Sequence, residues 1–117
     1  MNERQKEAMK AAKVLLLSNL AMVAYKMGDE KKCIKHCTEA LEIDTDCVKC
    51  LFRRGMLYSK RGGRGFSQDF AKAKADFAHL ARILPNSQLR KEAALLQKRV
   101  AAHKAKERKA FGGKLLK

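Results

Sequence analysis

The feature that most constrains this chain is an internal repeat at a spacing of 34 residues. Val14, Leu17, Met22, Lys26 and Gly28 recur as Val48, Leu51, Met56, Lys60 and Gly62. Beyond Gly62 the offset becomes 40, since Cys33, Cys37 and Ile43 match Ala73, Phe77 and Ile83, so residues are inserted near 61–67. Fixed periods of this size are typical of stacked helical units that bury their apolar faces against one another. The repeat predicts an all-α solenoid that offers a concave binding surface, and it favours a binding module over an enzyme.

Length and composition agree with one small helical domain. The chain has 117 residues, a single proline and 6% aromatic residues, which argues against a β-sandwich. The abundance of alanine, leucine, lysine and glutamate favours helices. The net charge of +15 predicts an acidic partner, which could be nucleic acid, a membrane surface or an acidic peptide.

Start and stop signals divide the sequence into five helices and their connections. The predicted helices run from about Asn2 to Met27, from Asp29 through Leu41, from Cys47 to Arg61, from Gln68 to Leu84, and from Asn86 or Ser87 to Lys109. Gly28 separates the first two helices, and Gly62-Gly63 is expected to end the third before a flexible basic loop at 61–67. The domain thus spans 1–110, with repeat 1 at about 14–47, repeat 2 at about 48–87, a capping helix at about 87–109 and a basic tail at 111–117.

At these positions the sequence resembles a known family. The chain resembles the tetratricopeptide-repeat (TPR) consensus at the positions where that consensus has its characteristic small, aromatic and turn residues. These positions are Leu20-Ala21, Gly28, Cys33, Ala40-Leu41, Gly55, Tyr58, Ala73, Phe77 and Pro85. The run SNLAMVAYKMGDEKKCIKHCTEALEID followed by CVKCLFRRG is similar to the C-terminal TPR domains of large immunophilins, the FKBP-type and cyclophilin-type prolyl isomerases. The resemblance implies an α–α superhelix of two TPR hairpins plus a long C-terminal capping helix. Those domains carry three repeats, so we expect a domain that lacks the first hairpin.

The resemblance also implies a partner and a site. Such domains bind the acidic C-terminal peptide of a heat-shock chaperone of the ninety-kilodalton class, with the seventy-kilodalton class as second choice, through a carboxylate clamp. Asn19 matches the clamp asparagine of the second repeat, and Lys49 and Arg53 match the two cations of the third. The first-repeat lysine and asparagine have no counterpart, so three of five clamp positions are present and weak binding is expected.

The spacing of these residues gives the clamp a physical basis. Lys49 and Arg53 are four apart and share a helix face, where Arg can hold a carboxylate bidentately while Lys acts as a point charge. Such a basic pair alone is more often part of a solvated cationic face than of a clamp, but its coincidence with Asn19 in the repeat frame favours the clamp. Around these residues, Met22, Phe52 and Met56 are expected to line the groove, and Lys26 and Lys60 to add long-range attraction.

Arg54 occupies a repeat position that is normally apolar, so we predict that it makes an ion pair with a neighbouring acid such as Asp76.

The positions of the four cysteines favour a structural role over metal binding or redox chemistry. Cys33 and Cys37 fall on core positions of the repeat, where cysteine behaves as a compact apolar residue. Cys47 and Cys50 form a CxxC pair, and with the first pair they have the number and type of ligands that a zinc site needs. We predict free thiols without zinc or any other cofactor, and a redox role is favoured less than zinc.

Two rival functions rest on the C-terminal segment 88–117, which is strongly basic. It suits nonspecific phosphate binding, although Phe111 is the single aromatic residue there that could stack on a base. Its amphipathic character also fits a calmodulin target or an acidic membrane surface. The same charges fit a solubilising cap on the end of a solenoid. We favour nucleic acid and membrane less than the acidic peptide.

No catalytic constellation is evident, and a parent protein is expected to supply any isomerase activity. No segment is expected to span a membrane, and Ser18 and Asn19 interrupt the apolar stretch Val14–Tyr25 that would otherwise resemble a signal-peptide core. We predict a cytoplasmic chain, or one shared with the nucleus. The exposed apolar face of Val14–Tyr25 predicts a homodimer or a domain-swapped assembly.

Overall fold

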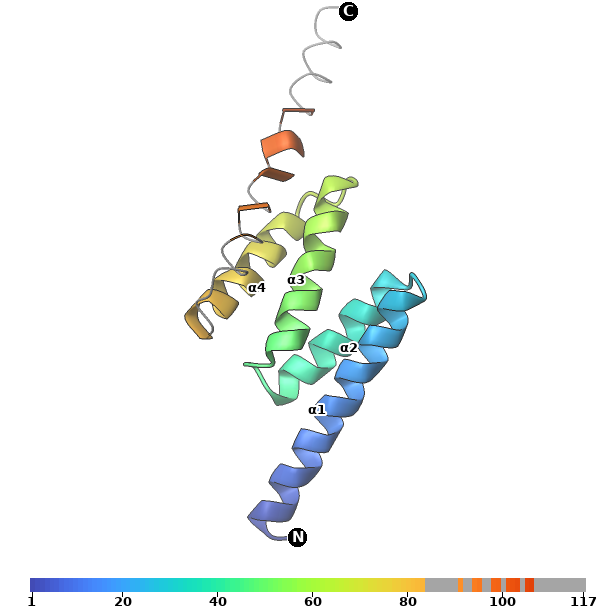
Figure 1. The fold of residues 1–117 in the computed structure, drawn as a ribbon, viewed down its shortest axis with the longest axis vertical. Coiled ribbons are helices and arrows are strands. Elements are labelled where there is room, and N and C mark those ends of the chain that lie inside the picture. Colours follow the sequence, from blue (N-terminus) through green and yellow to red (C-terminus); the bar gives the residue numbers. More distant parts are fainter. Residues whose placement is uncertain (84–90, 92–93, 96–97, 100, 104, 107–117) are drawn as a thin grey trace, which may run out of the picture. The chain divides into compact units, whose positions relative to one another are not determined.

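The computed structural model describes residues 1–83, 91, 94–95, 98–99, 101–103 and 105–106. Four continuous helices occur there: α1 (Glu3–Lys26), α2 (Glu30–Ile43), α3 (Val48–Gly63) and α4 (Asp69–Ile83) (Figure 1). These described residues include no strand, so the predicted all-α solenoid class is confirmed. The chain divides into two compact units, Met1–Leu57 and Tyr58–Lys117.

Helix α1 begins where the sequence predicts, because Asn2 caps it. The Gln5 backbone N–H donates to Asn2 Oδ1 at 2.8 Å, and the Asn2 backbone N–H donates to Gln5 Oε1 at 3.0 Å. This reciprocal capping box satisfies two backbone donors that a helix start leaves without intrahelical partners. Residues 3–13 of α1 are exposed, Val14 is half-buried, and the first buried residue is Leu17.

A tight turn joins α1 to α2, and the two helices form an antiparallel hairpin (Figure 1). Gly28 has φ of 77°, a left-handed conformation that glycine adopts without the cost of a Cβ. The next residue, Asp29, caps α2 through Oδ1, which accepts from the Lys32 backbone N–H at 3.1 Å. Gly28-Asp29 therefore both stops one helix and starts the next, as predicted.

The first unit has a core of small and medium side chains. Ala21, Cys33, Cys37, Ala40 and Cys50 are completely buried, with Leu17, Ala24, Leu41, Leu51 and Leu57 nearly so. Cys33 and Cys37 lie on the inner face of α2, which confirms their predicted place in the core. Because alanine and cysteine contribute little bulk, the hairpin helices can approach each other closely.

The end of α3 differs from the prediction. The helix continues through Gly62 and Gly63 instead of ending before them, and Arg61 lies in the helix rather than in a loop. The connection to α4 is short, and Gly65 has φ of 116° within it. Gly62 stays in the helix because it faces the Phe70 ring of α4, where a Cβ would lie 2.6 Å from Phe70 Cδ1. Close packing, and not helix termination, accounts for this glycine.

This contact predicts opposite effects for two adjacent glycines. Gly62→Ala should destabilise the chain by about 1–3 kcal/mol because the new Cβ overlaps the buried Phe70 ring. Gly63→Ala meets no atom within 4 Å, so it should be neutral or stabilise the helix by up to ~1 kcal/mol. Urea unfolding followed by circular dichroism compares the two midpoints. Equal shifts for both variants would contradict the packing argument.

The second unit has its own core on α4, formed by Phe70, Ala73, Phe77 and Leu80. The Asp69 carboxylate is also buried; its Oδ2 lies 3.4 Å from Arg61 Nε and its Oδ1 lies 3.7 Å from Lys72 Nζ. As the first residue of α4, Asp69 also suits the positive end of the helix dipole.

Of the predicted capping helix, the described residues are helical and contact this second unit. Arg99 Nη1 donates to Ser59 Oγ at 3.0 Å, and the His103 ring meets the Phe70 ring edge-on at 5.4 Å between centroids. The remainder of the predicted capping helix and the basic tail 111–117 lie outside the described residues.

By length and composition, α1 would suffice to cross a membrane, contrary to the expectation that no segment is long enough. Signal sequences and the core helices of soluble proteins have the same composition, so this finding alone assigns α1 no place in a membrane. Leu17, Ser18, Ala21 and Ala24 are its buried residues.

Candidate peptide-binding site

The three predicted clamp residues lie in the first unit, on two helices. Asn19 lies on α1 and is exposed, whereas Lys49 and Arg53 lie one turn apart at the start of α3. Lys49 is exposed and Arg53 is half-buried. The repeat period explains this arrangement, because residues of the first helix of each hairpin recur on the same face.

Arg53 links the two helices. Its Nη1 donates to the Ser18 carbonyl oxygen at 3.3 Å, and its Nη2 lies 3.8 Å from Met22 Sδ. Asn19 follows Ser18 directly, so the guanidinium is held against the turn of α1 that presents the asparagine. Guanidinium carries five N–H donors, so these two contacts leave donors for a bound carboxylate.

Lys49 borders a hollow of about 430 Å³ beside this site. Apolar residues of α1 and the end of α2 form part of its lining, and Glu7, Lys10, Asp44 and Lys49 supply the charges. Ser18 also lines it, so the hollow reaches the residue whose carbonyl holds Arg53. A ligand at Lys49 would find both apolar surface and charge within reach.

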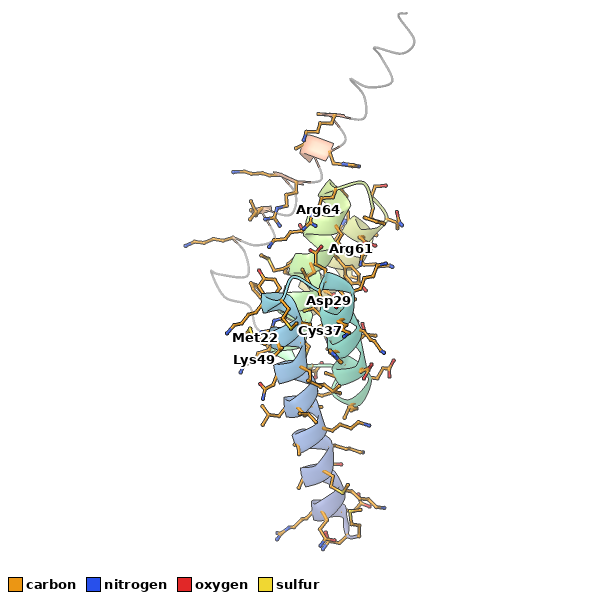
Figure 2. The ribbon with its side chains drawn as sticks, turned by 90° about the vertical axis from the view of Figure 1, so that its right-hand side faces the viewer. Met22, Asp29, Cys37, Lys49, Arg61 and Arg64 are labelled. Atoms are coloured by element: carbon orange, nitrogen blue, oxygen red, sulfur yellow. The ribbon has the colours of Figure 1, made fainter. Side chains whose placement is uncertain are left out.

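The remaining predicted groove residues differ in exposure. Met22 on α1 is exposed (Figure 2), and its Sδ lies 3.8 Å from Arg53 Nη2. Lys26 in the last turn of α1 is also exposed. Phe52 and Met56 on α3 are half-buried. Lys60, also half-buried, belongs to the second unit.

Arg54 has a partner that the sequence did not suggest. Its Nη1 donates to Thr38 Oγ1 of α2 at 3.2 Å. The Thr38 hydroxyl in turn donates to the Ile34 carbonyl at 2.8 Å, so it is available to Arg54 as an acceptor. The suggested ion pair with Asp76 stays a prediction.

Four free cysteines lie on α2 and at the start of α3. Cys33, Cys37 and Cys50 are buried, and Cys47 is half-buried. In the described part of the chain, no group of three or more Cys, His, Asp or Glu residues could hold a metal ion.

The directions of their pKa shifts divide these thiols into two kinds. Burial raises the pKa of Cys33 and Cys47, and a hydrogen bond with Cys50, together with burial, raises the pKa of Cys37. Cys50 differs, because a hydrogen bond from Cys37, with others from Cys47 and Ser18, lowers its pKa against the effect of burial. The Arg53 charge acts in the same direction. Cys50 is therefore the thiol of this cluster that most readily loses its proton.

Comparison with known families agrees with the repeat and the hairpins. Residues 14–47 match the family described as tetratricopeptide repeat, so this part of the chain is a TPR repeat. TPR hairpins are protein-interaction modules, and this chain is one.

Particular relatives identify the type of TPR domain. The chain is 35% identical over 108 residues to the peptidyl-prolyl cis-trans isomerase FKBP4 of Homo sapiens, covering 90% of this chain and 22% of that protein. The mouse FKBP4 is 33% identical over 94 residues, covering 80% of this chain and 19% of the relative. The chain thus spans about a fifth of the length of these curated relatives, and it is homologous to FKBP4.

A solved structure shows the same fold. The C-terminal TPR-containing domain of an FK506-binding protein of Plasmodium falciparum matches with a TM-score of 0.63 at 22% identity, covering 96% of this chain and 66% of the other. The chain is a TPR domain of the FKBP4-like immunophilin type.

Proposed function

We propose that this TPR domain is a co-chaperone module that binds the acidic C-terminal peptide of a heat-shock chaperone of the ninety-kilodalton class. The observation that carries the proposal is the position of Arg53, which is fixed on the Ser18 carbonyl beside exposed Asn19, with Lys49 one turn away. Together these side chains present amide, ammonium and guanidinium donors from two neighbouring helices. A peptide terminus that ends in an acidic residue has two carboxylates close together, which suits such a donor set.

Charge and apolar surface support the same partner. The net charge of +15 attracts an acidic peptide at long range, and the effect weakens as salt increases. Exposed Met22 beside Arg53 offers a flexible apolar contact for an aliphatic side chain of the peptide. The clamp as proposed uses Asn19, Lys49 and Arg53, with apolar contacts from Met22, Phe52 and Met56 and attraction from Lys26.

The proposed clamp is incomplete, and this sets the expected affinity. Each hydrogen bond to a charged group contributes about 1.5–3 kcal/mol, so two missing clamp positions cost a substantial part of the binding free energy. We expect weak but saturable binding by the chain alone. The proposal also includes a parent protein of the immunophilin type and a cytoplasmic, or also nuclear, location. It further includes a homodimer that forms through the exposed face of α1.

Titration calorimetry with a peptide ending in Met-Glu-Glu-Val-Asp tests the function. Lys49→Ala should weaken binding about tenfold or more, because it removes a cation from a charge-assisted contact. Lys35→Ala is the matched control, since it removes the same charge from an exposed position of α2 outside the site. The same peptide with an amidated C-terminus should bind much less, because one carboxylate is lost. Equal affinities for the two lysine variants would refute the clamp.

The nucleic-acid and calmodulin alternatives depend on the segment 88–117, most of which lies outside the described residues. No contact described above favours either of them, so neither is proposed.

A further inference from the structure

The segment that joins α3 to α4 has no part in the proposed peptide site. It holds the residues that are inserted relative to the first repeat, and it belongs to the second unit. Residues 63–68 are all exposed, and residues 64–68 lie outside the two helices. Exposed connections of this kind are the places where a modifying enzyme can reach the chain without unfolding a helix.

This connection contains one serine, Ser67, and Arg64 (Figure 2) precedes that serine by three residues. Both residues are exposed. No other serine or threonine in the sequence has an arginine three positions before it. Serine kinases of one large class select arginine at this position, because an acidic pocket beside their catalytic site binds the guanidinium. Ser67 therefore has the charge pattern of a substrate of these kinases.

The other serine and threonine residues that the structure describes suit such a kinase less well. Three of them are buried or half-buried: Ser18, Thr38 and Ser59. Thr45 is exposed, but Asp44 and Asp46 flank it, and an acidic pocket would repel both carboxylates. Exposure and charge together therefore favour Ser67.

Arg61 supplies a second guanidinium close to Ser67. Its Nε lies 3.4 Å from Asp69 Oδ2, and its guanidinium carbon lies 4.8 Å from the centre of the Phe66 ring. These two residues lie on either side of Ser67 in the sequence, so their contacts hold the guanidinium near the serine. A phosphoserine carries a charge of about −1.5 to −2 and three strong acceptor oxygens, which suit a guanidinium that is already held nearby.

We propose that Ser67 is a phosphorylation site for a serine kinase that selects arginine three residues before its target, and that Arg61 binds the added phosphate. The reaction is a phosphoryl transfer from ATP. Ser67 Oγ attacks the γ-phosphorus, a new O–P bond forms, the bond to the departing ADP breaks, and the serine proton passes to the catalytic base of the kinase. This inference goes beyond peptide binding and does not depend on it.

Incubation of the full chain with ATP, Mg²⁺ and the catalytic domain of calmodulin-dependent protein kinase II, which selects arginine at this position, tests the site. The chain should take up phosphate on Ser67, located by peptide mass mapping, and Ser67→Ala should take up none. Arg64→Ala should slow the uptake about tenfold or more, because the kinase loses its contact with the guanidinium. Arg82→Ala is the matched control, since it removes the same charge from an exposed position of α4, and it should react at the wild-type rate.

A synthetic peptide of residues 60–70 shows whether the fold leaves the serine accessible. The folded chain should react at a rate within about tenfold of the peptide, because the connection is exposed and no helix has to open. Circular dichroism of each variant confirms that it is folded before the reaction. The proposal would be overturned if only the peptide reacted, if the phosphate went to another residue, or if the two arginine variants reacted equally fast.

Nitrogen–proton NMR of the arginine side chains tests the contact between Arg61 and the phosphate. The Nε–H signal of Arg61, identified by its loss in Arg61→Lys, should move when Ser67 is phosphorylated, because a phosphate oxygen becomes its neighbour. The signal of Arg82, identified in the same way from Arg82→Lys, should stay in place. An Arg61 signal that does not move would overturn the assignment of Arg61 as the residue that binds the phosphate.

Discussion

Phe77→Ala is expected to destabilise the chain by about 3–5 kcal/mol, the cost of removing a large aromatic side chain from a packed core. Phe77 is 4% exposed and lies on the buried face of α4 with Ala73 and Leu80. A domain of this size is stable by only about 5–15 kcal/mol, so the variant should unfold at a much lower urea concentration.

Phe66→Ala is the matched control for this prediction. Phe66 is 48% exposed, and its ring faces the Arg61 guanidinium at 4.8 Å from the centroid. An exposed contact of this kind contributes about 0.5–1 kcal/mol. Urea unfolding followed by helical circular dichroism should therefore show a large shift for Phe77→Ala and a small one for Phe66→Ala. Comparable shifts would mean that the α4 core is not as tightly packed as the structure indicates.

Arg53→Ala is expected to reduce affinity for the acidic peptide about 30-fold or more. Truncating one partner of a buried, hydrogen-bonded charge pair costs about 2–5 kcal/mol, and every 1.4 kcal/mol is about a factor of ten. Arg53→Lys should recover only part of the loss, because lysine keeps the charge but lacks the planar fork that holds a carboxylate bidentately. Calorimetry with the same peptide gives all three affinities.

Arg54→Ala controls for a general loss of positive charge on α3. Arg54 is adjacent in sequence but donates to Thr38 on α2, away from the α1 residues that Arg53 contacts. The control variant should lose stability without losing affinity, apart from a small electrostatic effect that added salt removes. If both arginine variants lower affinity equally, the binding depends on net charge and not on a clamp.

Much of the fold could be predicted because local signals and the repeat agree. Asn2, Gly28 and Asp29 have the chemistry of helix caps and turns, and each performs that role. The 34-residue period placed cysteines at core positions of α2, where they are buried. These features depend on residues close in sequence, or on a pattern that the sequence repeats.

The errors arose where a distant contact decides the outcome. Two consecutive glycines predicted the end of α3, but Gly62 stays helical because the Phe70 ring occupies the space beside it. Likewise, the position of Arg53 against the Ser18 carbonyl follows from the way α3 packs on α1.

Ser18 holds Arg53 through its backbone: its carbonyl oxygen accepts from Arg53 Nη1 at 3.3 Å. The acceptor that positions the guanidinium therefore does not depend on which side chain stands at position 18. A substitution there can change the packing of α1 while the anchor of the arginine stays in place.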